Sequence, residues 1–249
     1  CVIDTGINSS HTAFTGRILA QKCFCDASDL GGAGCCQDTT NEDDDATDDH
    51  GHGTHVAGIA AGNGAGVIGV APGANLVIMK VTNSAGTGLF SDITQAVNWC
   101  TSNSSLYNIT VITISLGGGS YTAACDSDYT SLSQEISTAW SNNISVTVAA
   151  GNDASTTIMT SPACINKTIS VASSSKTDSI ASDTNRNFLT DLFATGVSIL
   201  SSSKSGSTET RSGTSMAAPH VAGMIAILQQ YKNNVEGRPL TSQEVNDTI

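Results

Sequence analysis

Three short, glycine-rich stretches of the chain each contain one polar residue, and the chemistry of the three residues is complementary. Asp4 follows an apolar run in CVIDTGI, His52 lies within DDHGHGTHVAGIAAG, and Ser215 lies within SGTSMAAPHVAG. A carboxylate can orient an imidazole, the imidazole can take a proton from a hydroxyl, and the hydroxyl can then attack an acyl carbon. Each residue also has a purely structural interpretation, as a turn cap, a helix-start side chain and a helix cap respectively.

The residues around Ser215 favour a reactive hydroxyl over a simple cap. Gly213, Ala217 and Ala218 are small and leave room for a large partner to approach. The following run VAGMIAILQQY is apolar nearly all round, which predicts a buried helix whose N-terminus presents Ser215. Backbone N–H groups and the dipole at such a helix start favour developing negative charge. Pro219 has no N–H, so the carbonyl of Ser215 four residues earlier loses its helical partner.

Other catalytic motifs leave one alternative open. His50, His52 and His55 form H-x-H-x-x-H, so a metal-dependent hydrolase is a second interpretation, although zinc sites usually space two histidines four apart. The G-x-S-x-G nucleophile motif of the α/β-hydrolases is not matched, because Ala217 stands where its second glycine belongs. S-x-x-K occurs at 173–176 and 201–204, without S-D-N or K-T-G nearby, and is interpreted as a coincidence in a serine-rich chain.

The elements that must position these residues alternate along the chain. Continuous apolar runs, typical of strands covered on both faces, predict strands at 1–3, 75–81, 109–116, 144–150, 168–172 and 191–194. Helices are predicted between them, at about 53–62, 91–102, 129–141 and 214–231. This alternation indicates an α/β fold, a three-layer sandwich with a central, mostly parallel sheet flanked by helices. Active residues in such sheets gather at the carboxyl ends of the strands.

One segment, residues 22–51, interrupts this alternation. It carries four cysteines and nine acidic residues and is interpreted as an insertion loop. Disulfides are the favoured role for its cysteines, because Cys-x-Cys followed by Cys-Cys lacks the spacing of a zinc knuckle. The acidic residues from Asp38 to Asp49 could chelate calcium, although no EF-hand pattern is present.

Composition limits the classes of partner and the compartment. The formal net charge of −12 argues against nucleic acid, because phosphates would be repelled. No apolar run approaches the roughly 18–20 residues that span a membrane. An even count of eight cysteines permits disulfides of undetermined pairing and, with N-x-S/T sequons, indicates an extracellular, secreted glycoprotein. The sequons begin at Asn8, Asn103, Asn108, Asn143, Asn166 and Asn246, and Asn8 is expected to be unoccupied.

Six motifs in a fixed order, VIDTGI, HGTHVAGI, GVAPGANLVIMKV, SLGGG, VAAGN and SGTSMAAPHVAG, resemble those of the subtilisin-like serine peptidases, closest to the proteinase K and extracellular subtilisin branches. The resemblance covers nearly the whole chain and includes the order Asp, His, Ser that subtilisin shows. It implies one peptidase catalytic domain over residues 1–249, truncated at both ends relative to a longer precursor. A catalytically inactive binding module of the same family is the alternative.

The same resemblance implies roles for further residues. Asp4, His52 and Ser215 would form the triad of a serine endopeptidase, and the amide of Asn152 would join the backbone N–H of Ser215 in binding the oxyanion. An extended peptide would lie between two backbone segments with little demand on its sequence. These segments are Ser115, Leu116 and Gly117 on one side and Gly86, Thr87 and Gly88 on the other.

Small residues would leave room for a large apolar substrate side chain in the primary pocket. Its walls would be Gly117 together with Ala149, Ala150 and Gly151, and Phe90 would line a further pocket. The expected partners are polypeptide substrates and the propeptide of the chain's own precursor, and a monomer is expected. Catalysis would need no cofactor, and structural calcium would bind at an unidentified site. Two departures from the family are His50, where Asn or Ser is common, and Thr195, where Pro is common.

Overall fold

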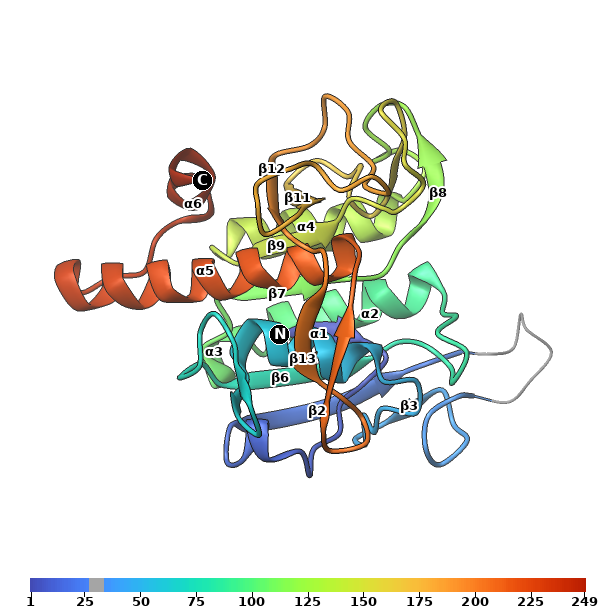
Figure 1. Cartoon of the computed structure of the whole chain (residues 1–249), viewed down its shortest axis with the longest axis vertical. Helices are drawn as coiled ribbons and strands as arrows, with labels where there is room; N and C mark the ends of the chain where they lie inside the picture. Colours follow the sequence, from blue (N-terminus) through green and yellow to red (C-terminus); the bar gives the residue numbers. More distant parts are fainter. Residues whose placement is uncertain (27–33) are drawn as a thin grey trace. The chain divides into compact units, whose positions relative to one another are not determined.

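The computed structural model describes residues 1–26 and 34–249, which form two compact units. Unit 1 consists of Cys1–Ile109 and Leu200–Glu209, and unit 2 consists of Thr110–Ile199 and Thr210–Ile249. Each unit contains a mostly parallel sheet with helices packed against it (Figure 1). The predicted α/β fold class is therefore confirmed.

The sheet of unit 1 has the strand order β1-β6-β2-β3. Strands β1 (Val2–Asp4), β6 (Leu76–Lys80) and β2 (Ile18–Phe24) are parallel, and β3 (Glu42–Asp43) is antiparallel to β2. Every residue of β1 and β6 is buried. Burial on both faces explains why both strands are continuous apolar runs in the sequence.

Strand β2 was missing from the predicted strands, and residues 22–24 of the predicted insertion loop belong to it. Only the last two residues of β2 are fully buried. Its sequence, ILAQKCF, therefore mixes polar and apolar residues and lacks the continuous apolar run that identified its neighbours.

Helices α1 (His52–Ala61) and α2 (Phe90–Ser102) match the predicted helices and pack against the sheet of unit 1. All residues of α1 except His52 are buried, and its alanines and glycines permit that close packing. The helix begins after Gly51, whose φ of 105° favours glycine. The shorter elements of unit 1 are η1 (Thr12–Phe14), β4 (Asn63–Gly64), β5 (Val67–Ile68) and α3 (Ser104–Tyr107).

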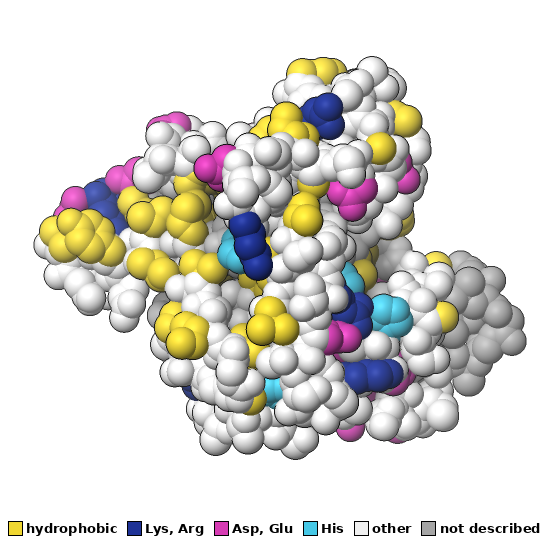
Figure 2. Space-filling model, in the orientation of Figure 1, with side chains coloured by type: hydrophobic (Ala, Val, Ile, Leu, Met, Phe, Trp, Pro, Cys, Tyr) yellow, Lys and Arg dark blue, Asp and Glu magenta, His cyan; other side chains and the backbone are white. Residues whose placement is uncertain are grey.

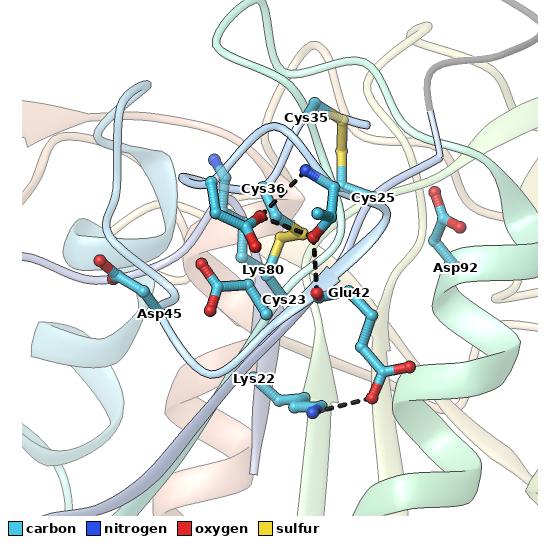
Figure 3. Close-up of a disulfide and its surroundings, with 12 residues drawn as sticks. Lys22, Cys23, Cys25, Cys35, Cys36, Glu42, Asp45, Lys80 and Asp92 are labelled. Atoms are coloured by element: carbon cyan, nitrogen blue, oxygen red, sulfur yellow. Dashed lines mark hydrogen bonds and ion pairs between the residues drawn. A yellow bond between two sulfur atoms is a disulfide. The ribbon is translucent and has the colours of Figure 1, made fainter. Parts of the chain in front are cut away.

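The cysteine-rich insertion is held by two disulfides, Cys23–Cys36 and Cys25–Cys35, which confirms the predicted disulfide role (Figure 3). Residues 27–33 of the insertion lie outside the described residues. Acidic side chains of the insertion accept hydrogen bonds from nearby backbone groups. Asp38 bonds the backbone N–H of Thr40, and Asp45 bonds that of Thr47. Among the residues that the structure describes, no cluster of three or more His, Cys, Asp or Glu side chains could hold a metal ion. The calcium prediction therefore stays without a location.

The sheet of unit 2 has the strand order β7-β9-β11-β12, and all its neighbours are parallel. Its strands are β7 (Val111–Ile114), β9 (Ser145–Ala149), β11 (Thr168–Ser174) and β12 (Leu192–Thr195). All four lie within or overlap the predicted apolar runs. Strands β9 and β11 are buried along their whole length, as expected for central strands.

The long helix α5 (Thr214–Glu236) packs against all four of these strands, and α4 (Thr130–Ser141) packs against β9. Ala217, Ala218, Val221 and Ile225 form the face of α5 that enters the core of unit 2. The predicted helix is thus confirmed and its first half is buried, but residues 230–236 are mostly exposed, and the helix extends five residues beyond its predicted end. The remaining elements of unit 2 are β8 (Gly118–Tyr121), β10 (Met159–Ser161) and α6 (Ser242–Thr248). Strands β13 (Ile199–Ser202) and β14 (Thr208–Arg211) overlap the Leu200–Glu209 segment of unit 1.

Two further disulfides, Cys1–Cys100 in unit 1 and Cys125–Cys164 in unit 2, complete the pairing of all eight cysteines.

No helix among the described residues has the length and hydropathy needed to cross a membrane. On the face drawn in Figure 2, acidic and basic side chains are interspersed among uncharged ones.

Candidate active site

Asp4 and His52 are joined by a hydrogen bond within unit 1. Asp4 ends β1 and is fully buried, and His52 begins α1 with 16% of its side chain exposed. The distance from His52 Nδ1 to Asp4 Oδ1 is 2.7 Å, and the same oxygen accepts from the backbone N–H of Thr5 at 2.7 Å. Because an ionised carboxylate only accepts, Nδ1 carries the proton and Nε2 of a neutral imidazole has a lone pair. The arrangement therefore prepares His52 to act as a base.

Asp48 fixes the helix start that carries His52. Its Oδ1 accepts from the backbone N–H of Gly51 at 2.6 Å and from the hydroxyl of Thr5 at 2.8 Å. Its Oδ2 accepts from the backbone N–H and the hydroxyl of Thr54 at 2.9 and 2.5 Å. One carboxylate thus satisfies orphan donors at the start of α1 and ties that start to the chain after Asp4.

Burial would raise the pKa of Asp48, but its hydrogen bonds, from Thr54 first and then Gly51 and Thr5, outweigh burial and hold the pKa below its usual value. The sequence prediction missed this residue. An acidic residue four positions before His52, just ahead of a predicted helix, is the helix-start signal that could have found it.

Ser215 is the second residue of α5, in unit 2, and is half-buried. Its hydroxyl donates to the backbone carbonyl of Ser115 at 3.1 Å. The Ser115 hydroxyl donates in return to the carbonyl of Ser215 at 2.9 Å. That carbonyl is the one Pro219 leaves without a helical donor, so Ser115 supplies the bond that the helix cannot.

Asn152 lies beside the start of α5 with a defined amide orientation. Its Oδ1 accepts from the backbone N–H of Thr214 at 2.8 Å and from the Thr214 hydroxyl at 3.1 Å. A backbone N–H can only donate, so the carbonyl end of the amide must face Thr214 and Nδ2 must face away. The Thr214 hydroxyl also accepts from the backbone N–H of Gly151 at 3.2 Å, which links this residue to the same cluster.

The predicted substrate-binding residues fall into both units. In unit 1, Gly86 and Thr87 lie in a turn closed by Asn83, and Gly88 follows it, exposed. In unit 2, Ser115, Leu116 and Gly117 follow β7, while Ala149, Ala150 and Gly151 end β9 and continue from it. Gly151 has a φ of 110°, and a Cβ there would lie 2.4 Å from Asn185 Nδ2, so a larger residue would disturb this strand end.

Within unit 1 the structure brings Asp4 and His52 together, and within unit 2 it brings Ser215, Asn152 and Ser115 to one helix start. The meeting of the two groups at one catalytic centre stays a prediction.

The other histidines have different contacts. His55 bonds the carbonyl of Glu209 through Nε2 at 3.1 Å, and the ring of His50 lies 6.2 Å from that of His52.

Comparison with known proteins gives one consistent family. The sequence model of the subtilase family matches residues 1–249, which includes both units. Alkaline serine exoprotease A of Vibrio alginolyticus is 36% identical over 234 residues, which is 94% of this chain and 39% of that protein. The major intracellular serine protease of Bacillus subtilis is 35% identical over 251 residues, which is 98% of this chain and 72% of that protein.

A solved structure of a cold-adapted subtilisin-like serine proteinase is also similar. It has a TM-score of 0.78 at 34% identity and covers 99% of this chain and 78% of its own. The chain spans only part of the length of its curated relatives, from 39% to 72% in the two proteins above. This similarity extends over both units and agrees with the predicted fold.

Proposed function

Because the chain belongs to the subtilase family of serine proteases, we propose that it is the catalytic part of a secreted serine endopeptidase. The observation that carries the proposal is the 2.7 Å bond between Asp4 Oδ1 and His52 Nδ1 at the end of a buried strand. That bond leaves Nε2 of His52 to accept a proton. Ser215, which would donate it, lies at the start of the longest helix.

In the proposed reaction, His52 removes the proton of Ser215 as its Oγ attacks the peptide carbonyl. The tetrahedral intermediate collapses to an acyl-enzyme, and the imidazolium gives its proton to the departing amine. Water then attacks the ester: His52 takes a proton from the water and returns it to Ser215 Oγ as the ester bond breaks and the carboxylic acid leaves. Asp4 stabilises the imidazolium through each transfer without itself taking a proton.

The oxyanion would be bound by two donors at the start of α5. The backbone N–H of Ser215 is one of the first N–H groups of the helix, which have no carbonyl partner within it. The amide Nδ2 of Asn152 would be the second, and the contact between Asn152 Oδ1 and Thr214 gives it a fixed direction before substrate arrives. Donors that are already oriented need no reorganisation when the charge develops.

Substrate would bind in extended form along backbone groups. Ser115 to Gly117 would pair with one edge of the peptide and Gly86 to Gly88 with the other, so affinity would depend little on sequence. The small residues Ala149, Ala150 and Gly151 would form part of an apolar primary pocket. We propose polypeptides of broad sequence as substrates and the propeptide of the chain's own precursor as a partner.

The disulfides support the proposal of secretion. All eight cysteines are paired, and such bridges persist in oxidising compartments. The sequon residues Asn108, Asn143, Asn166 and Asn246 are exposed and could carry glycans. Mass spectrometry of protein exported by a eukaryotic host should find no free thiol and should find glycan on some of these residues.

A fluorophosphonate probe tests the proposed activity. We expect covalent labelling of Ser215, located by peptide mass spectrometry, together with casein hydrolysis by the full-length protein. Ser215→Ala should lose both while its circular dichroism stays unchanged, and Ser131→Ala, an exposed serine of α4, should lose neither. An intact protein with no labelling and no hydrolysis would instead indicate the inactive binding module. Activity lost only to a strong zinc chelator would indicate the metal-dependent hydrolase.

A further inference from the structure

Lys80 is a buried cation to which the proposed reaction gives no role. It ends β6 opposite Asp4 in the parallel register, and only 1% of its side chain is exposed. The next backbone N–H, that of Val81, donates to the carbonyl of Asp4 at 2.9 Å. An ammonium is costly to bury unless its partners compensate the lost hydration, so its position beside Asp4 needs a physical reason.

The contacts of Lys80 join the chain that follows Asp4 to the segment that precedes His52. Its Nζ donates to Asp49 Oδ1 at 2.7 Å and to the backbone carbonyl of Thr5 at 3.2 Å. Thr5 directly follows Asp4, and Asp49 lies three residues before His52. One ammonium therefore holds the chain after the carboxylate and the segment leading to the imidazole at a fixed separation.

The charge of Lys80 also bears on the protonation of His52. Asp4 Oδ2 is buried and accepts no hydrogen bond from any residue that the structure describes. A positive charge on the strand beside Asp4 opposes a second positive charge on the imidazole that Asp4 binds. The carboxylate of Asp49 has the opposite effect on that imidazole.

We propose that Lys80 is a positioning residue for His52: with Asp49 it keeps the Asp4–His52 bond in register and sets the pH at which His52 becomes a base. The catalytic consequence rests on the proposed function, whereas the effect on the His52 titration does not. Other charged or titratable groups lie beside these residues in unit 1. Asp4 is bonded to His52, the ring of His50 lies 6.2 Å from that of His52, and Asp48 accepts from the backbone N–H of His50. His55 follows three residues after His52 on α1, and Lys204 Nζ donates to the carbonyl of Asp49.

Opposite changes to the two members of the pair give the test. The titration of His52 is followed by NMR in the intact protein, and the pH profile of kcat/KM is measured beside it. Lys80→Met removes the cation and leaves Asp49 unpaired, so the midpoint of the His52 titration should rise by roughly 0.5–1 pH unit. Asp49→Asn leaves the cation unopposed, so the midpoint should fall by a similar amount. Asp49 is one-third exposed, so this second variant retains the buried core.

Two further variants separate positioning from general stability. Lys80→Arg keeps the charge and should restore the wild-type midpoint. Lys22→Met removes a lysine of β2 that is paired with Glu42 at 2.8 Å (Figure 3) and with Asp44 at 2.9 Å. This variant should leave the midpoint unchanged. In an active enzyme, Lys80→Met should also lower kcat by about 10²-fold, the scale of a misplaced catalytic group, with KM changed less than twofold.

The outcomes distinguish this inference from the proposed function. Midpoints that move in opposite directions for Lys80→Met and Asp49→Asn support it, even if the wild-type protein hydrolyses nothing. If Lys80→Met fails to fold, the Asp49→Asn midpoint decides alone. The inference is overturned if the His52 titration midpoint in Asp49→Asn stays within 0.2 pH unit of wild type. It is also overturned if Lys22→Met shifts the His52 midpoint as much as Lys80→Met does. An active wild-type enzyme with unmoved midpoints would refute the role of Lys80 and leave the proposed peptidase intact.

Discussion

The hydroxyls of Ser115 and Ser215 each donate to the other residue's backbone carbonyl, at 2.9 and 3.1 Å. The relationship follows from Pro219, which cannot donate to the Ser215 carbonyl as residue 219 of an ordinary helix would. Ser115 satisfies that carbonyl from the end of β7 and so ties the strand end to the helix start. The same strand end is where the proposed substrate would pair.

Removing the Ser115 hydroxyl should therefore destabilise unit 2. Ser115→Ala leaves the Ser215 carbonyl without a donor, and we expect the free energy of unfolding to fall by about 1–3 kcal/mol, as for other orphaned buried groups. Urea denaturation followed by circular dichroism measures the loss.

Pro219→Ala provides the control for this prediction. It restores an N–H four residues after Ser215, so Ser115→Ala should cost less than half as much in the Pro219→Ala background. Equal losses in both backgrounds would show that the Ser115 hydroxyl stabilises the protein in another way.

Asn152→Ala should lower kcat far more than it changes KM. The side chain would donate only to the charge that develops in the transition state, so its loss should reduce kcat by about 10²–10³-fold, the effect measured in subtilisin on removing such a donor. Asn142→Ala is the control, because its amide bonds only the end of its own helix. Steady-state kinetics on a peptide p-nitroanilide would refute the role if kcat fell less than tenfold.

Asp92 should make stability depend on pH. It is 1% exposed at the start of α2, and burial raises its pKa to about 6, although its carboxylate accepts from the backbone N–H of Asp26. The folded protein therefore holds this proton more tightly than the unfolded chain, whose value is near 3.8. The resulting stabilisation is fully present below about pH 4 and is lost as the pH rises through about 6.

Asp92→Asn should remove this loss of stability at rising pH, because the asparagine amide does not ionise. We expect it to raise the free energy of unfolding at pH 7 by about 1–3 kcal/mol and to have little effect at pH 4. Asp128→Asn, an exposed carboxylate, should leave the pH dependence as it is. Thermal melts across pH 4–8 make the comparison, and a variant that stays as pH-sensitive as the wild type would contradict the assignment.

The Cys125–Cys164 disulfide should contribute more to stability than Cys25–Cys35. The two bridges close segments with sequence separations of 39 and 10. A longer loop loses more entropy in the unfolded chain when it is closed, which gives about 4 and about 3 kcal/mol respectively. Replacing each pair by alanine and comparing the unfolding free energies would test the order, and an inverted order would show that local packing outweighs loop entropy.

Strands β1, β6 and β9 could be predicted because burial on both faces leaves a continuous apolar run in the sequence. Helix α5 could be predicted from the apolar residues of its first half, several of which enter the core of unit 2, whereas its last turns are mostly polar and exposed. Strand β2 could not, because most of its residues are not fully buried and the polar pair Gln21 and Lys22 interrupts its apolar run. A strand that is buried on one side only, or that lies at an edge, has a weaker hydrophobic pattern. The sequence of such a segment does not by itself distinguish a strand from a loop.

For the site, the sequence by itself determined which functional groups are present. They are a carboxylate at a strand end, an imidazole and a hydroxyl at helix starts, and a proline that leaves one carbonyl without a helical hydrogen-bond donor. Tertiary structure decided the partners. Asp48, Lys80 and Ser115 acquire their roles from groups between 3 and 100 positions away in the chain. The pairing of the eight cysteines was decided in the same way. A buried polar group is stabilised by whichever donor or acceptor the fold brings within about 3 Å, and that distance depends on the path of the whole chain rather than on local spacing.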